Sequence, residues 1–426
     1  MVLSSSVPAS LQVPSDFNRY ADITDHEILQ RLDRWKHATV PTLQNLQSHF
    51  HSEQASSLTL KQQADIVSAT LVFNGEDVWV NPAAQTVAHD ILDGFCEPSV
   101  PLVIQILEHN VKPLFRYNPH PSLNLQTGRK LARPAGGPMA SQDFYDDQAW
   151  KTHPGASNIV LWCVENIPST AYEELWHLVI PPIMALLDDY EPGYKLKGVK
   201  ILTVMLERVP GSVLKRTGVD SLLSASLGRS LTQLQSPETS RLLPAAISAS
   251  LSLILLVTPV GSVDRFDQLC GLLGDGIIGT IWPYSSDRLE ALLASIEALP
   301  PLVKILGVGC ARYLKVLVAQ LVHPLSPRAF DKTSVALQIS SLRALSAVID
   351  ACPERIPQWK GTILNSIARC WVGIMDANLD HPSEQLKREL RNVCQRLSAV
   401  CPTVLQDEYP LFIAADAAIF EELFET

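Results

Sequence analysis

Apolar residues recur along most of this chain at intervals of three and four positions, the spacing of one helix face. Three stripes show it most clearly, and each runs toward a proline. The stripes are Leu196, Val199, Leu202, Leu206 and Val209; Ile339, Leu342, Leu345 and Ile349; and Leu386, Leu390, Val393, Leu397 and Val400. Patterns that alternate apolar and polar residues, as half-buried strands do, are lacking. The pattern predicts an all-α protein.

Two of these stripes also resemble each other in sequence. Leu-Ser-Ala-Val occurs at 345–348 and again at 397–400, and a Cys-Pro pair follows each copy closely. The tetrapeptides are 52 residues apart and the Cys-Pro pairs 49, slightly above the roughly 40–47 residues of a HEAT or armadillo repeat. A helix pair of this kind buries its faces only by stacking on its neighbours. We therefore predict a HEAT/armadillo-like α-solenoid of stacked antiparallel helix pairs.

Composition along the chain suggests five segments. We expect a flexible N-terminal tail at 1–20, a helical region at 21–117, and a Pro/Gly-rich basic loop with its lead-in at 118–149. The HEAT-like repeats then occupy 150–403. An acidic segment at 404–426 either caps the last repeat or docks onto another protein. Within the repeats, Pro181-Pro182 is expected to interrupt or kink a helix spanning 174–188.

One stretch, Leu242 to Val263, carries no charged residue and is long enough to cross a bilayer. Pro244, Pro259 and several hydroxyl side chains dilute it, and no basic cluster flanks it. A helix that is apolar all round is also typical of the core of a large α-protein. We interpret it as a buried helix and expect no membrane association.

Composition narrows the class of function. Hydrophobic residues make up 46% of the 426 positions and charged residues 18%, so intrinsic disorder is excluded. The net charge of −10 disfavours nucleic-acid binding, which needs clustered basic residues. The eight cysteines form no C-x-x-C pair, and the N-terminus has no secretory signal pattern. These features indicate an intracellular protein with reduced cysteines.

The sequence shows no motif for catalysis, cofactor binding or metal binding. Walker A, G-x-S-x-G, H-E-x-x-H and G-x-G-x-x-G patterns are absent. Paired carboxylates occur at Asp146-Asp147 and at 188–189, where the latter end a helix before a Pro-Gly turn. We expect the 188–189 acids to face Lys195, Lys197 or Lys200 and to join neighbouring helices, with contact to a partner as the alternative. Catalytic, cofactor and metal residues are each predicted to be none.

The stretch from Trp150 to Leu234 resembles a known protein family. The resemblance rests on Asp-Asp-Gln-Ala-Trp-Lys at 146–151, Leu-Trp-Cys-Val at 161–164, a run at 178–190 ending in Leu-Leu-Asp-Asp-Tyr, Tyr-Lys-Leu-Lys-Gly at 194–198, and Leu-Lys-Arg-Thr-Gly-Val at 214–219. These segments resemble the Tel-two-interacting protein two family. The signature positions carried over, as structural or partner-binding residues, are Trp150, Trp162, Pro181, Pro182, Asp188, Asp189, Tyr190, Lys195, Lys197, Gly198, Arg216, Thr217 and Gly218.

The resemblance implies a function as well as a fold. Members of that family are subunits of the three-subunit Triple T (TTT) complex. The complex is a co-chaperone that works with the ninety-kilodalton heat-shock chaperone on phosphatidylinositol-3-kinase-related kinases (PIKKs). The resemblance thus implies a non-enzymatic scaffold, cytoplasmic and nuclear, bound to the other two subunits. The alternative is a transport-receptor-like solenoid that binds cargo peptides and a small GTPase.

Overall fold

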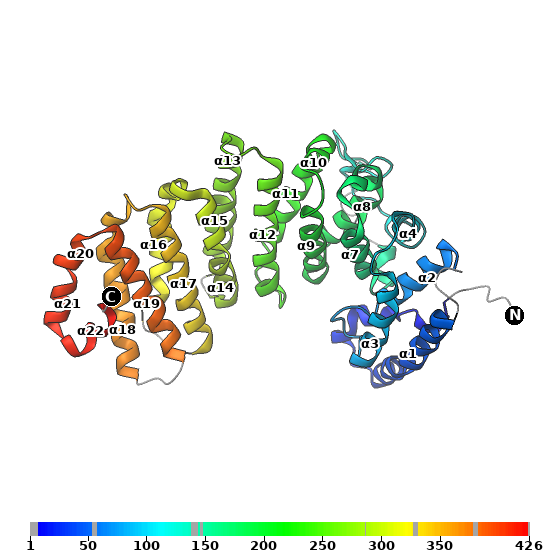
Figure 1. Ribbon diagram of the computed structural model, residues 1–426, viewed down its shortest axis with the longest axis horizontal. Coiled ribbons are helices and arrows are strands. Elements are labelled where there is room, and N and C mark those ends of the chain that lie inside the picture. The colour runs from blue at the N-terminus through cyan, green and yellow to red at the C-terminus, as the bar shows by residue number, and fades with distance from the viewer. Residues whose placement is uncertain are drawn as a thin grey trace. The chain divides into compact units, whose positions relative to one another are not determined.

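The computed structural model describes residues 7–52, 58–137, 144, 148–285, 287–326, 331–377 and 382–424. In these ranges the chain is almost entirely helical, with a single pair of two-residue strands (Figure 1). This confirms the prediction of an all-α protein. Packing divides the chain into two compact units, Met1–Ser226 and Leu227–Thr426, which are described in turn.

The first unit combines helices of very different length with one short β-hairpin. Its elements are η1 (Ala9–Leu11), η2 (Ser15–Asp22), α1 (His26–Ser52), α2 (Leu60–Leu71), α3 (Pro82–Leu92), η4 (Asp93–Phe95), α4 (Val100–Ile106), η5 (Leu107–Val111), α5 (Lys112–Phe115), β1 (Leu123–Asn124), β2 (Arg129–Lys130), η6 (Ala149–Thr152), α7 (Ala156–Asn166), η7 (Ser169–Ala171), α8 (Tyr172–Leu187), α9 (Pro192–Leu206) and α10 (Gly211–Thr217). Helix α11 (Val219–Ser230) crosses the boundary between the units.

The N-terminal residues differ from the expected flexible tail. Residues 7–20 carry η1 and most of η2, and they bury Leu11, Val13 and Phe17 to 5% exposure or less. The ring of Phe17 lies 5.5 Å from that of Trp35 and 6.1 Å from that of Trp79. Burial of these side chains supplies the free energy that orders the segment. Residues 1–6 lie outside the described residues.

The segment expected as an exposed basic loop contains a small β-hairpin. Strands β1 and β2 pair antiparallel, with Leu123 opposite Lys130, and Leu123 is buried. The side chain of Asn124 accepts hydrogen bonds from the N–H groups of Gln126 and Thr127, which stabilises the turn. Gly128 adopts a φ of 64°, and its carbonyl accepts a bond from Trp176 Nε1 at 2.8 Å. The hairpin is therefore attached to α8.

Helices α7, α8 and α9 form the centre of this unit. Helix α9 packs on both α7 and α8. Its predicted stripe is buried, since Leu196, Val199, Leu202 and Leu206 are at most 6% exposed. Helix α8 continues through Pro181 and Pro182 to Leu187, so the expected interruption was wrong, and the alternative of a kink stays a prediction.

The second unit is built of helices throughout its described residues. Its elements are α12 (Thr239–Val257), α13 (Val263–Gly271), η8 (Leu272–Ile281), η9 (Trp282–Tyr284), α14 (Leu289–Glu297), α15 (Leu299–Leu306), η10 (Gly307–Tyr313), α16 (Leu314–Val322), η11 (His323–Leu325), α17 (Lys332–Ala351), η12 (Ile356–Trp359), α18 (Lys360–Ala377), α19 (Pro382–Val400), α20 (Thr403–Gln406), α21 (Tyr409–Ala415) and α22 (Ala417–Phe424).

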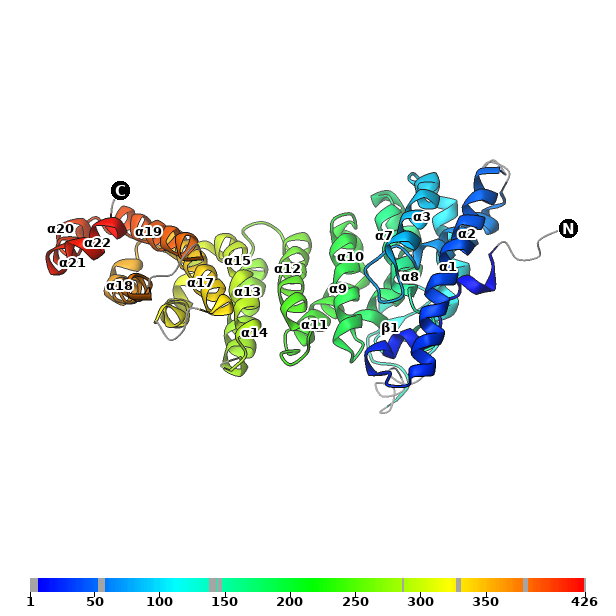
Figure 2. The same cartoon turned by 90° about the horizontal axis from the view of Figure 1, so that it is seen from below.

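These helices stack as a repeat protein does. Helix α12 packs on α14, α14 on α17 and α17 on α19, so each of these helices contacts the next in the stack (Figure 2). The two Leu-Ser-Ala-Val copies lie near the ends of α17 and α19, and their Leu345 and Leu397 are fully buried. After each copy, the N–H of Cys352 or Cys401 bonds back to the last helical turn. The sequence repeat is thus a structural repeat.

Two described stretches are long and apolar enough to cross a membrane by length and composition alone, Thr239–Val257 and Leu289–Leu325. The first is α12, which buries Leu242, Leu243 and Ala246 completely and packs on α14. The second comprises five short elements from α14 to η11, with a φ of 55° at Gly307 between two of them. Their packing within the unit favours the interpretation of core helices.

The acidic C-terminal segment packs on α18 and α19. Trp371 Nε1 donates to the carbonyl of Ile419 at 2.7 Å, and the Tyr409 hydroxyl donates to that of Cys394 at 2.7 Å. Tyr409 stacks on Phe424 with 4.0 Å between the ring centroids. These contacts cover the end of the last long helix pair.

Candidate functional site

The turn between α8 and α9 contains the Asp-Asp-Tyr signature. The N–H of Asp188 closes the last turn of α8 by bonding to the Met184 carbonyl at 3.0 Å. The carboxylate of Asp189 accepts the N–H of Glu191 at 2.8 Å, an Asx turn. Pro192 then starts α9, a position where its missing N–H is harmless. The local sequence therefore specifies a tight turn with two acidic side chains.

Asp189 is buried, and its charge is matched by a lysine from a different segment. Lys151 Nζ lies 2.8 Å from Asp189 Oδ2 and 2.9 Å from Glu191 Oε1. The side chains of Asp189 and Lys151 are 2% and 18% exposed. Burial alone lowers the pKa of Lys151, but the hydrogen bonds and charges of Asp189 and Glu191 outweigh it and hold that pKa above its ordinary value. The lysine is thus firmly charged.

Aromatic rings surround the same ammonium group. Lys151 Nζ lies 4.2 Å from the ring centroid of Tyr190, 5.2 Å from that of Tyr194 and 5.6 Å from that of Trp150. Trp150 and Tyr194 meet edge to face at 4.7 Å. Rings so placed attract a cation through their negative faces. Because the chain's own lysine fills this cage, the cage is a structural element.

Asp188 binds a histidine from the loop segment. His120 Nε2 lies 2.9 Å from Asp188 Oδ2, and the two side chains are 10% and 2% exposed. The Nδ1 atom of His120 accepts the N–H of Ser122 at 3.2 Å, so the hydrogen-bond network places the ring proton on Nε2. The ring therefore donates to Asp188 and fastens the loop to the end of α8.

Two lysines of α9 complete the junction. Lys195 Nζ donates to the Leu187 carbonyl at 3.0 Å. Lys197 Nζ lies 2.8 Å from Asp77 Oδ1, and Asn158 donates to the other oxygen of Asp77 at 3.0 Å. We call the set Asp77, His120, Lys151, Asp188, Asp189, Glu191, Lys195 and Lys197 the polar junction. It joins α8 and α9 to segments from before residue 152.

Glycine is required where α9 crosses the end of α8. A Cβ atom at Gly198 would lie 2.7 Å from the backbone nitrogen of Leu187 and 2.9 Å from the carbonyl carbon of Leu186. Real Cβ atoms do not approach backbone that closely, so any other residue would push the helices apart. The close approach also brings Lys195 within reach of the Leu187 carbonyl.

The structure brings together seven of the thirteen signature residues around the polar junction. They are Trp150, Asp188, Asp189, Tyr190, Lys195, Lys197 and Gly198. The other six lie elsewhere: Trp162 is buried in α7, Pro181 and Pro182 lie within α8, and Arg216, Thr217 and Gly218 end α10. Their role in partner binding stays a prediction. The Asp146-Asp147 pair lies outside the described residues.

The expected lysine partner of Asp189 was wrong. We expected Lys195, Lys197 or Lys200 from the next helix, but Asp189 pairs with Lys151, while Lys197 pairs with Asp77. Sequence reasoning also missed His120 and Asp77, which lie 68 and 120 positions from their partners. The position of Lys151 directly after Trp150 in the signature was the available signal.

The second unit exposes a group of apolar side chains. Val260, Val263 and Phe266, at and before the start of α13, are 88%, 74% and 40% exposed. Ile305 and Val308, at the end of α15 and in η10, are 41% and 74% exposed. The two sets are neighbours, since a Cβ at Gly309 would meet the Phe266 ring at 2.7 Å. We call these five residues the α13–η10 patch; exposed apolar groups of this kind mark interaction surfaces.

The described residues contain no group of three or more His, Cys, Asp or Glu placed to hold a metal ion. The carboxylates of the polar junction are engaged by Lys151, Lys197 and His120. The arrangement is a joint between helices in which each carboxylate has a lysine or histidine partner.

A scan against protein-family models matches residues 65–330 to the Tti2 family. The chain belongs to the Tti2 family. All thirteen signature residues, the polar junction and the α13–η10 patch lie inside the matched range. This confirms the resemblance found in the sequence.

Two curated relatives of this Tti2-family chain are both called TELO2-interacting protein 2. The rat protein is 24% identical over 216 residues and the mouse protein 23% over 214. Each match covers 49% of this chain and 40% of the relative. The alignment therefore spans less than half of the curated relatives' length.

Solved structures of the karyopherin Kap121p share the fold of this Tti2-family chain. Kap121p bound to Pho4p superposes with a TM-score of 0.51 at 14% identity, covering 95% of this chain and 37% of the karyopherin. A Kap121p mutant gives a TM-score of 0.52 with the same coverage. Together with the stacked helices, this likeness confirms the predicted α-solenoid.

Proposed function

We propose that this Tti2-family chain is a non-enzymatic scaffold subunit of a TTT co-chaperone complex, in the cytoplasm and nucleus. The complex would support maturation of PIKKs with the ninety-kilodalton heat-shock chaperone. The match of residues 65–330 to the Tti2 family carries the proposal. The names of the rat and mouse relatives, which describe an interaction with TELO2, support it.

The α13–η10 patch is the surface we propose for the partner subunit. The exposed Arg312 lies over the Phe266 ring of this patch at 5.7 Å. An apolar centre with a charged rim is the usual anatomy of a protein interface. The proposal names a TELO2-like subunit as the occupant, because TELO2 is the partner named for the relatives.

Co-expression with the other two subunits tests the proposal. The wild-type chain should co-purify with both, and Val263→Glu or Val308→Glu should reduce recovery of the TELO2-like subunit at least tenfold. Leu411→Glu is the matched control, because Leu411 is 70% exposed on α21 and lies outside the patch. Failure of the wild-type chain to co-purify would contradict the subunit assignment. Equal loss with all three variants would contradict only the patch.

The similarity to the karyopherin does not support the transport-receptor alternative, because at 14% identity it concerns the fold alone. A direct pull-down with a transport GTPase in its GTP form separates the two functions. The scaffold proposal expects no GTP-dependent binding there.

A further inference from the structure

Two segments of the first unit that lie far apart in the chain meet at one surface. One is the β1–β2 hairpin, whose second strand carries Arg129 and Lys130. The other is the end of α10, which carries the signature residues Arg216 and Gly218. Lys130 Nζ donates to Ser221 Oγ at 2.7 Å across 91 positions, and the Lys130 Cβ would lie 3.4 Å from a Cβ added at Gly218. The hairpin thus rests on the end of α10.

Helix α8 holds both segments in place. The ring of Trp176 packs so closely on the hairpin that a Cβ at Gly128 would lie 2.7 Å from it. One turn earlier on α8, Glu173 pairs with Arg216 at 2.6 Å. Because the hairpin and the end of α10 are both fixed to α8, the surface that they form needs little ordering when a ligand binds.

The hairpin segment contributes basic side chains without acidic partners. Arg129, Lys130 and Arg133 are all exposed, and no carboxylate of the described residues pairs with them. The N–H of Ala135 donates to the carbonyl of Pro121 at 2.8 Å, which fixes the backbone just after Arg133. These three cations therefore project from an ordered segment, and their charges are open to an incoming anion.

The end of α10 adds two more basic side chains, each in an exposed ion pair. Lys215 is 45% exposed and lies 3.2 Å from Asp220, and Arg216 is 50% exposed beside a Glu173 that is 67% exposed. Exposed pairs of this kind are weak, so a ligand can compete for the cations. We call the five basic residues of the two segments, Arg129, Lys130, Arg133, Lys215 and Arg216, the basic hairpin surface.

Charge selects the ligand of this surface. Its five cations outnumber the two neighbouring carboxylates, on a chain whose net charge is −10. The guanidinium groups of three arginines match carboxylates in shape as well as charge. A nucleic acid or an anionic membrane would extend beyond this surface and meet the negative charge of the remaining chain, whereas a short peptide segment would not. We propose that the basic hairpin surface binds a segment of a partner protein that is rich in glutamate and aspartate.

This proposal is independent of the TTT assignment, because a synthetic peptide tests it. Fluorescein-labelled hexaglutamate, titrated into the full chain, should bind saturably by fluorescence anisotropy, and hexaglutamine should not. Salt raised from about 0.1 M to about 1 M shortens the Debye length from about 10 Å to about 3 Å and should weaken binding at least tenfold. Absence of binding, binding that is insensitive to salt, or tighter binding of a labelled hexathymidylate would overturn the proposal.

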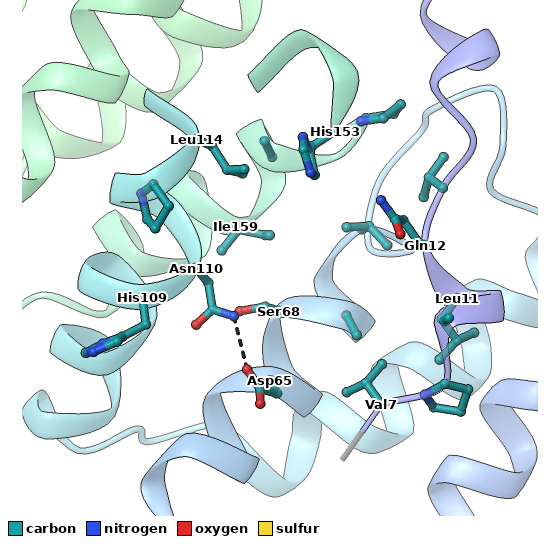
Figure 3. Close-up of a pocket in the computed structure, with 18 residues that line it drawn as sticks. Val7, Leu11, Gln12, Asp65, Ser68, His109, Asn110, Leu114, His153 and Ile159 are labelled. Atoms are coloured by element: carbon teal, nitrogen blue, oxygen red, sulfur yellow. Dashed lines mark hydrogen bonds between the residues drawn. The ribbon is translucent and has the colours of Figure 1, made fainter. Parts of the chain in front are cut away.

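A cavity in the same unit provides the place for a control. It has a volume of about 490 Å³ and lies between residues 7–13, α2, the η5–α5 helix and the start of α7 (Figure 3). Its described lining residues include Asp65 but no lysine or arginine, so an acidic peptide gains no ion pair there. Two exposed lysines lie on helices that bound this cavity, Lys61 on α2 and Lys112 at the start of α5.

Charge reversal at matched positions locates the binding. Arg129→Glu combined with Arg216→Glu should weaken hexaglutamate binding at least tenfold, because hydrogen bonds to charged groups are strong. Lys61→Glu combined with Lys112→Glu changes the net charge equally and should leave affinity within about twofold. Equal losses in both double variants would overturn the site. If the first double variant does not fold, Arg129→Glu alone should weaken binding at least threefold, and unchanged binding in it contradicts the proposal.

Discussion

The α8–α9 turn and the α17–α19 seam are both held by ion pairs, but in different ways. At the turn, Lys151 reaches a carboxylate that is 2% exposed, and the paired residues lie 38 positions apart. At the α17–α19 seam, Arg343 pairs with Glu389 at 2.9 Å and Arg396 with Asp350, each across 46 positions. Arg343 is 50% exposed and Glu389 11%, whereas both members of the second pair are at least 40% exposed. The ion pairs between α17 and α19 join residues about one repeat length apart, whereas the ion pair at the α8–α9 turn joins segments that are not neighbouring repeats. The first unit thus depends on buried, non-local polar contacts, and the second on neighbour packing.

The largest expected effect comes from removing the buried carboxylate. Asp189→Ala leaves Lys151 short of one partner and frees the Glu191 N–H, so the free energy of unfolding should fall by about 3–5 kcal/mol. Urea unfolding measures this. Glu191→Ala is the control, because that carboxylate is 42% exposed, and should cost below about 1 kcal/mol. Equal losses would show that burial does not distinguish the two acids.

Loss of a buried core side chain should lower the free energy of unfolding by a similar amount in both regions. Leu202→Ala in α9 and Leu390→Ala in α19 each remove a fully buried side chain, and each should cost about 2–5 kcal/mol. In the proposed complex, the same variants should lower partner abundance in cells, measured by immunoblot. Wild-type partner levels beside a destabilised variant would contradict that coupling.

The close crossing of α8 and α9 at Gly198 can be tested by adding a single methyl group there. Gly198→Ala forces a methyl group against the α8 backbone and should destabilise by about 1–3 kcal/mol. Gly228→Ala in α11 is the matched control, because no atom lies within 4 Å of the added Cβ. It should stabilise by about 0.5–1 kcal/mol, since alanine favours a helix. Thermal unfolding of both variants checks the opposite signs.

Alkaline pH should weaken the fold through Tyr172 of α8. Burial raises the pKa of Tyr172 to about 12, although the charge of Arg208 opposes the shift. The unfolded tyrosine loses its proton near pH 10, so this contribution is complete below pH 10 and is lost between about 10 and 12. The free energy of unfolding should fall by up to about 1.4 kcal/mol for each pH unit in this range. Tyr172→Phe should reduce this fall, as measured by urea unfolding at several pH values across the range.

The smallest effect is expected at the seam. A double-mutant cycle on Arg343 and Glu389 should give a coupling of about 0.2–1 kcal/mol, because Arg343 is 50% exposed and the charges are screened. The same cycle on Lys151 and Asp189 should give a clearly larger value. Similar couplings at both places would remove the contrast between the two regions.

The same contrast explains what the sequence could predict. Helices α9, α17 and α19 follow from their apolar stripes, because periodicity reports which face of a helix is buried. The solenoid follows from the repeated Leu-Ser-Ala-Val segments of the second unit. The partners of Asp188 and Asp189 could not be predicted from the sequence, because helical spacing does not indicate contacts between residues 38 or 68 positions apart. Leu11 and Phe17 were missed because so short a segment shows no period.

The packing of α1 bears on where the chain can be cut. The Tti2 match begins at residue 65 and ends at 330, yet α1 packs on α3 inside that range, and α17 packs on α14 and α15. Trimming the chain to the matched range would strip those covering helices and expose apolar faces at both ends to water. A fragment with these limits would be expected to aggregate. The boundary that marks the family is therefore not a folding boundary.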